Sequence, residues 1–155
     1  MVAVVGIEMK QGEVRYCVLD GTRQSPTFVE HGVKHFGLPA EAPELMDFFR
    51  QTFEEIINTY KPEAVGYRIA LSVPPSVKKA EQYPYLYFSC GMLCLICHDN
   101  NIPATMFNGN SFGAAFFGGA KGNKMTLCDG IVGQHPPKWD DSARMAALAA
   151  LGVLS

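Results

Sequence analysis

Ala3-Val4-Val5-Gly6-Ile7-Glu8 is a run of small and apolar residues that ends on an acid. Such a run is typical of a strand buried on both faces, and the Lys10-Gln11-Gly12 segment after it is typical of a tight turn. We therefore expect a central strand that presents a carboxylate at its C-terminal end and then turns back into an antiparallel neighbour. Taken alone, Glu8 is better explained as a solvated carboxylate at the mouth of a loop than as a functional group.

The rest of the chain supplies strands and helices around this first strand. Apolar residues at alternate positions predict strands at 13–20 and 27–36, the second of them nearer an edge because it carries more charge. An amphipathic helix at 42–60 ends at Lys61-Pro62 and leads to a strand at 64–71. Because a helix connects that strand to the first three, it should run parallel to the first strand.

The second half of the chain is less regular. A largely buried apolar helix is expected at 83–100, a short strand at 103–108 and a helix of small residues from Asp141 onward, whereas 72–81 is expected to be a loop. Glycines divide 109–138 into short helical pieces at best. The predicted fold class is α/β: a five-stranded mixed sheet, formed by a three-stranded antiparallel meander and two parallel strands, with helices on both faces. Residues 1–155 should form a single domain.

The composition of the chain argues against several classes of protein. The formal net charge of −2 and the 18% of charged residues argue against a broad basic surface that binds duplex DNA by counterion release. Glu8 interrupts the apolar start before it could span a bilayer, so we expect a cytoplasmic protein without a membrane segment. Five cysteines, an odd number scattered through apolar segments, favour free thiols.

Two motifs suggest cofactors that we reject. Cys90, Cys94 and Cys97 have the spacing that some enzymes use to hold an iron–sulfur cluster, but they lie at helical spacing in an apolar segment, which favours buried thiols facing the core. The glycines at 118–124 do not follow a strand or precede a helix in the way a phosphate-binding loop requires.

The order of the elements is that of the ribonuclease H-like fold, and within it the chain resembles the RuvC-type Holliday-junction resolvases. Gly6-Ile7-Glu8 is similar to their Gly-Ile-Asp on the first strand, the strand at 64–71 to their Ala-Ile-Glu strand, and Asp141–Ala146 to their final Asp-x-x-Asp-Ala helix start. The resemblance implies that the family's metal-binding carboxylates fall on Glu8, Arg68, Asp141 and Arg144. Such a set would hold two divalent cations, Mg²⁺ or Mn²⁺, that cleave a phosphodiester.

Two of these four positions are arginine, which cannot coordinate a metal. We therefore predict ion pairs in place of the metals, no cofactor, and a nucleic-acid-binding or assembly module that has lost nuclease activity. The first alternative is a divergent Mg²⁺- or Mn²⁺-dependent endonuclease acting on structured DNA, with Glu8 and Asp141 as surviving ligands and Asp140 or Glu81 as a substitute. The second is a protein-interaction domain using exposed aromatic residues, Trp139, Phe116 and Phe117.

A set of lysines falls in segments near the C-terminal edge of the parallel strands: Lys78, Lys79, Lys121, Lys124 and Lys138. They are candidates for a phosphate-binding rim, although lysine also simply populates solvated loops. The expected partner is structured DNA or RNA, bound weakly, and a second copy of the chain, forming a homodimer, is a further candidate.

Overall fold

The computed structural model describes residues 2–10, 12–37, 41–70, 83–108 and 110–155. Five strands and four helices form the described part, in the following chain order: β1 (Val4–Lys10), β2 (Glu13–Thr22), β3 (Ser25–His35), α1 (Ala42–Tyr60), β4 (Ala64–Ile69), α3 (Tyr83–Asp99), β5 (Ala104–Phe107), α4 (Lys124–Val132) and α5 (Asp141–Val153). The loop expected at 72–81 lies outside the described residues.

The strands form one sheet in the order β3-β2-β1-β4-β5. β1 is antiparallel to β2, β2 is antiparallel to β3, and β1, β4 and β5 run parallel. The predicted meander, the two parallel strands and the central place of β1 are thus confirmed. β3 is an edge strand, and its pairing with β2 is interrupted by an irregularity at Val18/Leu19.

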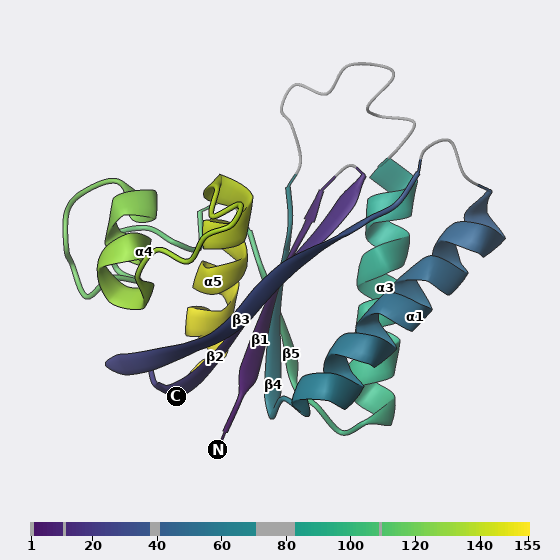
Figure 1. Ribbon diagram of the computed structural model, residues 1–155, viewed down its shortest axis with the longest axis horizontal. Helices are drawn as coiled ribbons and strands as arrows, with labels where there is room; N and C mark the ends of the chain where they lie inside the picture. Colours follow the sequence, from purple (N-terminus) through teal and green to yellow (C-terminus); the bar gives the residue numbers. More distant parts are fainter. Residues whose placement is uncertain (1, 11, 38–40, 71–82, 109) are drawn as a thin grey trace.

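Helices cover both faces of the sheet, as predicted (Figure 1). α1 and α3 pack on one face over the alternate side chains of β1 that include Val5, Ile7 and Met9. α5, with α4 beside it, covers the other face, where Val4 lies in the core. α1 begins with a proline in its first turn and ends at Lys61, whose φ of 46° is left-handed, so the Lys61-Pro62 stop is also confirmed.

α5 lies in backbone contact with the sheet. Gly6 of β1 and Gly66 of β4 are register partners, and both face α5. A Cβ added at Gly66 would lie 2.1 Å from the carbonyl oxygen of Ala149, and one added at Gly6 would lie closer still to that of Ala146. The alanines of α5 and the two glycines therefore fit together as two surfaces without room for a methyl group.

Two expectations need correction. α3 is not largely buried: Tyr87 and Leu95 are 55% and 56% exposed, because the helix packs on α1 and has few contacts with the sheet. The aromatic residues expected to be exposed, Trp139, Phe116 and Phe117, are half-buried and pack against the core beneath α5. None of the helices among the described residues is long and apolar enough to cross a membrane.

Candidate functional site

Three charged side chains form a row across the sheet on the face that α5 covers. Glu8 on the central strand is the register partner of Arg15 on β2 and of Arg68 on β4. Because side chains alternate between the two faces of a strand, Glu8 follows Gly6 on the α5 face, and Arg68 follows Gly66 in the same way. One acid therefore lies between two arginines.

Glu8 is almost completely buried, with 1% of its surface exposed. Its Oε1 accepts a hydrogen bond from Nη1 of Arg68 at 2.5 Å, whereas its Oε2 has no hydrogen-bond partner. Burial raises the pKa of Glu8 to about 7, against the opposing charges of Arg68, Lys10 and Lys124. The ion pair only partly offsets the loss of hydration, because Oε2 is taken out of water without receiving a donor.

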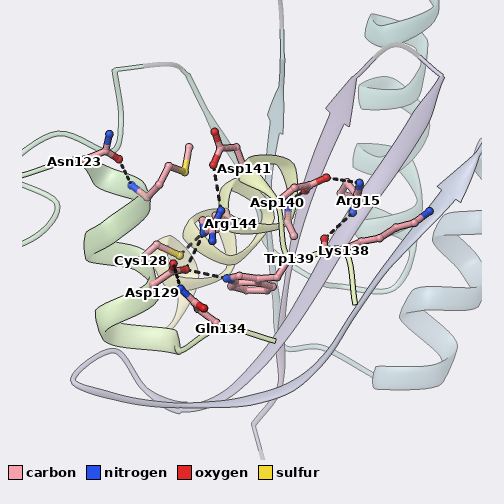
Figure 2. Close-up of polar contacts among 12 residues, drawn as sticks. Arg15, Asn123, Cys128, Asp129, Gln134, Lys138, Trp139, Asp140, Asp141 and Arg144 are labelled. Carbon is pink, nitrogen blue, oxygen red and sulfur yellow. Dashed lines mark hydrogen bonds and ion pairs between the residues drawn. The ribbon is translucent and has the colours of Figure 1, made fainter. Parts of the chain in front are cut away.

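Arg15 is also buried and joins the sheet to the start of α5. Its Nη2 donates to Oδ2 of Asp140 at 2.7 Å, and its Nη1 donates to the carbonyl of Lys138 at 3.3 Å (Figure 2). The other carboxylate oxygen of Asp140 caps α5 by accepting from the backbone N–H of Ala143. Both oxygens of Asp140 are thus engaged, so its predicted role as a substitute metal ligand would require these bonds to break.

Arg144 belongs to a second charged cluster, between α5 and α4. Its Nε donates to Oδ1 of Asp129 at 2.8 Å and its Nη1 to Oδ1 of Asp141 at 3.2 Å (Figure 2). Asp129 also accepts from Trp139 Nε1 and Gln134 Nε2, and its bond from Arg144 contributes most to lowering its pKa. The predicted pairing of Arg144 with Asp141 is present, but the better buried partner is Asp129, because Asp141 is 76% exposed.

The lysines are distributed unevenly around these clusters. Lys124, at the start of α4, is close enough for its charge to lower the pKa of Glu8. Lys138 contacts Arg15 through its backbone carbonyl. Lys121 is exposed, and no hydrogen bond or ion pair joins its side chain to either cluster in the part of the chain described. Lys78, Lys79 and Glu81 lie outside the described residues.

The predicted acids that the structure describes lie in two separate clusters. Among the described residues, no group of three or more His, Cys, Asp or Glu side chains is placed to hold a metal ion. Glu8 is paired with Arg68, Asp141 with Arg144, and no hydrogen bond or ion pair between described side chains connects the two acids to one site. Because Mg²⁺ needs several oxygen ligands around one point, the residues that the structure describes do not by themselves fit the two-cation centre that the sequence resemblance implies.

Sequence reasoning missed Arg15 and Asp129. The position of Arg15 could have been predicted from the sequence. Lys10 pairs with Glu13 across the β1–β2 turn, and two residues further from the turn on each strand Arg15 lies opposite Glu8. The role of Asp129 could not have been predicted, because α4 lies in the glycine-rich stretch, whose sequence has no helical periodicity. Together the two residues hold two charged groups of the predicted site region by hydrogen bonds: Arg15 holds Asp140, and Asp129 holds Arg144.

The sheet order, the connections and the two helical layers are those of the ribonuclease H-like fold. Similar solved structures are Thermus thermophilus RuvC (TM-score 0.74, 17% identity, 97% of this chain and 92% of that chain) and a T. thermophilus RuvC in complex with a Holliday junction substrate (0.72, 15%, 97% and 91%). The yeast mitochondrial Holliday junction resolvase Ydc2 is also similar (0.65, 15%, 96% and 76%). At these identities the likeness establishes the fold. No protein-family model and no curated protein sequence matches the chain.

Proposed function

We propose that this chain is a nucleic-acid-binding or assembly module of RuvC-like fold in which ion pairs take the place of a two-metal nuclease centre. The observation that carries the proposal is the contact between the buried Glu8 and the partly exposed Arg68, two side chains on adjacent parallel strands. A guanidinium donates hydrogen bonds and cannot coordinate a cation. Its positive charge beside the only buried acid of the row also opposes the binding of a divalent ion.

The nucleic-acid part of the proposal rests on the cations near this row. Lys124 acts electrostatically on Glu8, and Arg15 and Lys138 meet at the start of α5. T. thermophilus RuvC, which is similar in fold, has been solved with a Holliday junction substrate. Since the chain carries a net charge of −2, we expect binding of structured DNA that is weak and sensitive to salt.

Calorimetric titration with Mn²⁺ tests the metal part. We expect no binding heat at sub-millimolar concentration, with Glu8→Ala as the matched control. A clear heat in the wild type that Glu8→Ala abolishes would refute the ion-pair interpretation. Incubation of a four-way DNA junction with Mg²⁺ or Mn²⁺ should leave it intact, and metal-dependent cleavage that requires Glu8 would have the same consequence.

Fluorescence anisotropy with the same junction tests the nucleic-acid part. Lys124→Glu should weaken binding more than Lys61→Glu, which makes an identical charge change on an exposed residue at the end of α1. Equal effects would show that only net charge matters and that this face is not the binding surface.

One observation favours the endonuclease alternative. Oε2 of Glu8 has no partner, so one carboxylate oxygen remains available for a metal if the surrounding side chains rearrange. The cleavage assay above decides between this alternative and the binding module.

A homodimer remains a prediction, and the exposed side of α3 is where we place it. Tyr87, Gly91 and Leu95 follow one another at intervals of four residues, and a side chain at Gly91 would meet no other atom. Sedimentation of the wild type and of Leu95→Glu tests this placement: the variant should be monomeric at concentrations where the wild type is a dimer.

A further inference from the structure

A cavity of about 200 Å³ lies beside the Arg15–Asp140 contact, between β3 and the segment that leads into α5. Its walls include Arg15, Phe28, His31, Val33, Pro137 and Lys138. Phe28, Val33 and Pro137 give it apolar sides, Arg15 and Lys138 bring positive charge, and Glu30, which also lines it, brings negative charge. The cavity is separate from Glu8 but shares Arg15 with the charged row, since Arg15 is the register partner of both Glu8 and Val33.

Some polar atoms in the walls of this cavity have no hydrogen-bond partner. Four buried side-chain nitrogen or oxygen atoms of the described residues lack a hydrogen-bond partner, and two of them, Nε of Arg15 and Nδ1 of His31, belong to side chains that line the cavity. Nε of Arg15 lies 3.4 Å from Oε2 of Glu13, which is an ion-pair contact without hydrogen-bond geometry. Nε2 of His31 lies 2.5 Å from the carbonyl oxygen of His135 and donates to it, so Nδ1 is the ring nitrogen that has no partner.

Aromatic rings are concentrated at this cavity: Phe28 and His31 line it, and His135 and Trp139, which do not line it, pack against them. The ring of Phe28 stacks on that of His135 at 3.6 Å between centroids, and His31 lies 5.8 Å from Phe28. Trp139 contacts both Phe28 and His31 with its edge. Nucleic-acid-binding proteins combine these elements, flat apolar side chains for stacking and cations for the backbone, wherever they hold an unpaired base.

We propose that this cavity binds a single unpaired nucleotide, with the base between Phe28, Val33 and Pro137 and the phosphate toward Arg15 and Lys138. The inference rests on the proposed function and adds the class of ligand: a base that is free of pairing, as at the branch point or frayed end of structured DNA. Duplex DNA is excluded from the cavity because its bases are stacked and paired.

The size of the space supports one base rather than a longer ligand. A cavity of about 200 Å³ is below the range of drug-sized ligand pockets, which is about 300–1,000 Å³. Neighbouring nucleotides must therefore continue outside it.

Trp139 provides the measurement, because it is the chain's one tryptophan and touches two wall residues. Its fluorescence is followed during titration with deoxyadenosine 5′-monophosphate, with deoxyribose 5-phosphate, and with a short single-stranded oligonucleotide or its abasic counterpart. We expect the nucleotide and the base-carrying strand to change the fluorescence and the two base-free ligands to bind at least about tenfold more weakly.

Val33→Phe tests the location, because it fills the cavity from the wall while keeping a residue that suits a strand. Val29→Phe is the matched control on the same strand, at an exposed position that does not line the cavity. Val33→Phe should abolish nucleotide binding, and Val29→Phe should leave it unchanged. Circular dichroism of both variants checks that they fold.

The outcomes separate this inference from the proposed function. If Val33→Phe binds the nucleotide like the wild type, or if the abasic strand binds as well as the base-carrying one, the cavity is not a base site. If the junction still binds in a Lys124-dependent manner in that case, the proposed function stands and only this inference falls. If neither junction nor nucleotide binds, both are wrong.

Discussion

Replacement of Glu8 by glutamine should change how stability depends on pH. Glu8 is buried, and burial raises its pKa from 4.5 to about 7 despite the ion pair with Arg68. A group whose pKa is higher in the folded than in the unfolded protein stabilises the fold below the unfolded value and loses that contribution as the pH rises through the folded value. The wild type should therefore lose stability between pH 4.5 and about 7 because of this one carboxylate.

The magnitude follows from the two pKa values. Their difference corresponds to about 3 kcal/mol between the protonation states. Glutamine has the shape of the neutral acid and does not titrate, so Glu8→Gln should lack this loss. Relative to the wild type, the free energy of unfolding of Glu8→Gln should rise by about 3 kcal/mol between about pH 5 and about pH 8.

Urea denaturation at both pH values measures the effect, and taking the difference between variant and wild type cancels the groups that titrate in both. Glu13→Gln is the control with opposite sign. Burial acts to raise the pKa of Glu13, but the hydrogen bond from Lys10 and the charge of Arg15 outweigh it and lower the pKa. Its contribution is thus lost as the pH falls. If wild type and Glu8→Gln have parallel pH profiles, Arg68 fully compensates the burial of Glu8 and the reasoning is refuted.

Three further predictions concern packing, the second charged cluster and the thiols. Gly6→Ala should lower the free energy of unfolding, measured by urea denaturation, by at least about 3 kcal/mol, because the added Cβ would overlap the backbone of α5. Gly91→Ala should leave the free energy of unfolding unchanged or raise it, because nothing lies within 4 Å of an added Cβ there. Asp129→Ala should lower the free energy of unfolding by about 2 kcal/mol and change the emission spectrum of Trp139, since it removes the acceptor of the indole N–H; an unchanged spectrum would contradict the contact. A thiol reagent should modify Cys94 first in the native protein, because the other four cysteines are buried and burial raises their pKa, and the purified protein should be colourless.

The contact between Glu8 and Arg68 could have been predicted from the sequence. Gly6-Ile7-Glu8 and Gly66-Tyr67-Arg68 share a spacing, a glycine two residues before a charge, and a helix between two strands makes them parallel neighbours. Once the glycines are matched, Glu8 and Arg68 become register partners. The hydrophobic pattern sets this register strongly because both strands are buried.

The cluster around Arg144 and Asp129 could not have been predicted in full from the sequence. Asp141 and Arg144 are three residues apart on α5, and that pairing follows from helix geometry alone. The stronger partner, Asp129, comes from a segment whose glycines and lack of period hide its helix. Long-range contacts of such a segment depend on how it folds against α5, which no local pattern encodes.

The exposure of α3 was misjudged for a related reason. The helix is apolar on most sides, and this composition normally indicates burial all round. The sheet and α1 cover only the side that includes Leu93 and Cys97, so the remaining apolar residues stay at the surface of a single copy. Composition reports what a helix can bury, not how many neighbours the fold provides.

Gly6 and Gly66, which are uncharged, set the position of the charged residues on α5 because the helix packs directly on them. Asp140 and Asp141 start α5, and the helix rests on Gly6 and Gly66 with no spare room. A single methyl group added beneath it would tilt or lift the helix and move both acids relative to the sheet. A screen that substitutes only ionisable side chains would therefore overlook the positions that set the geometry of the site, and a pair of residues without side chains should tolerate less variation than the acids and arginines they align.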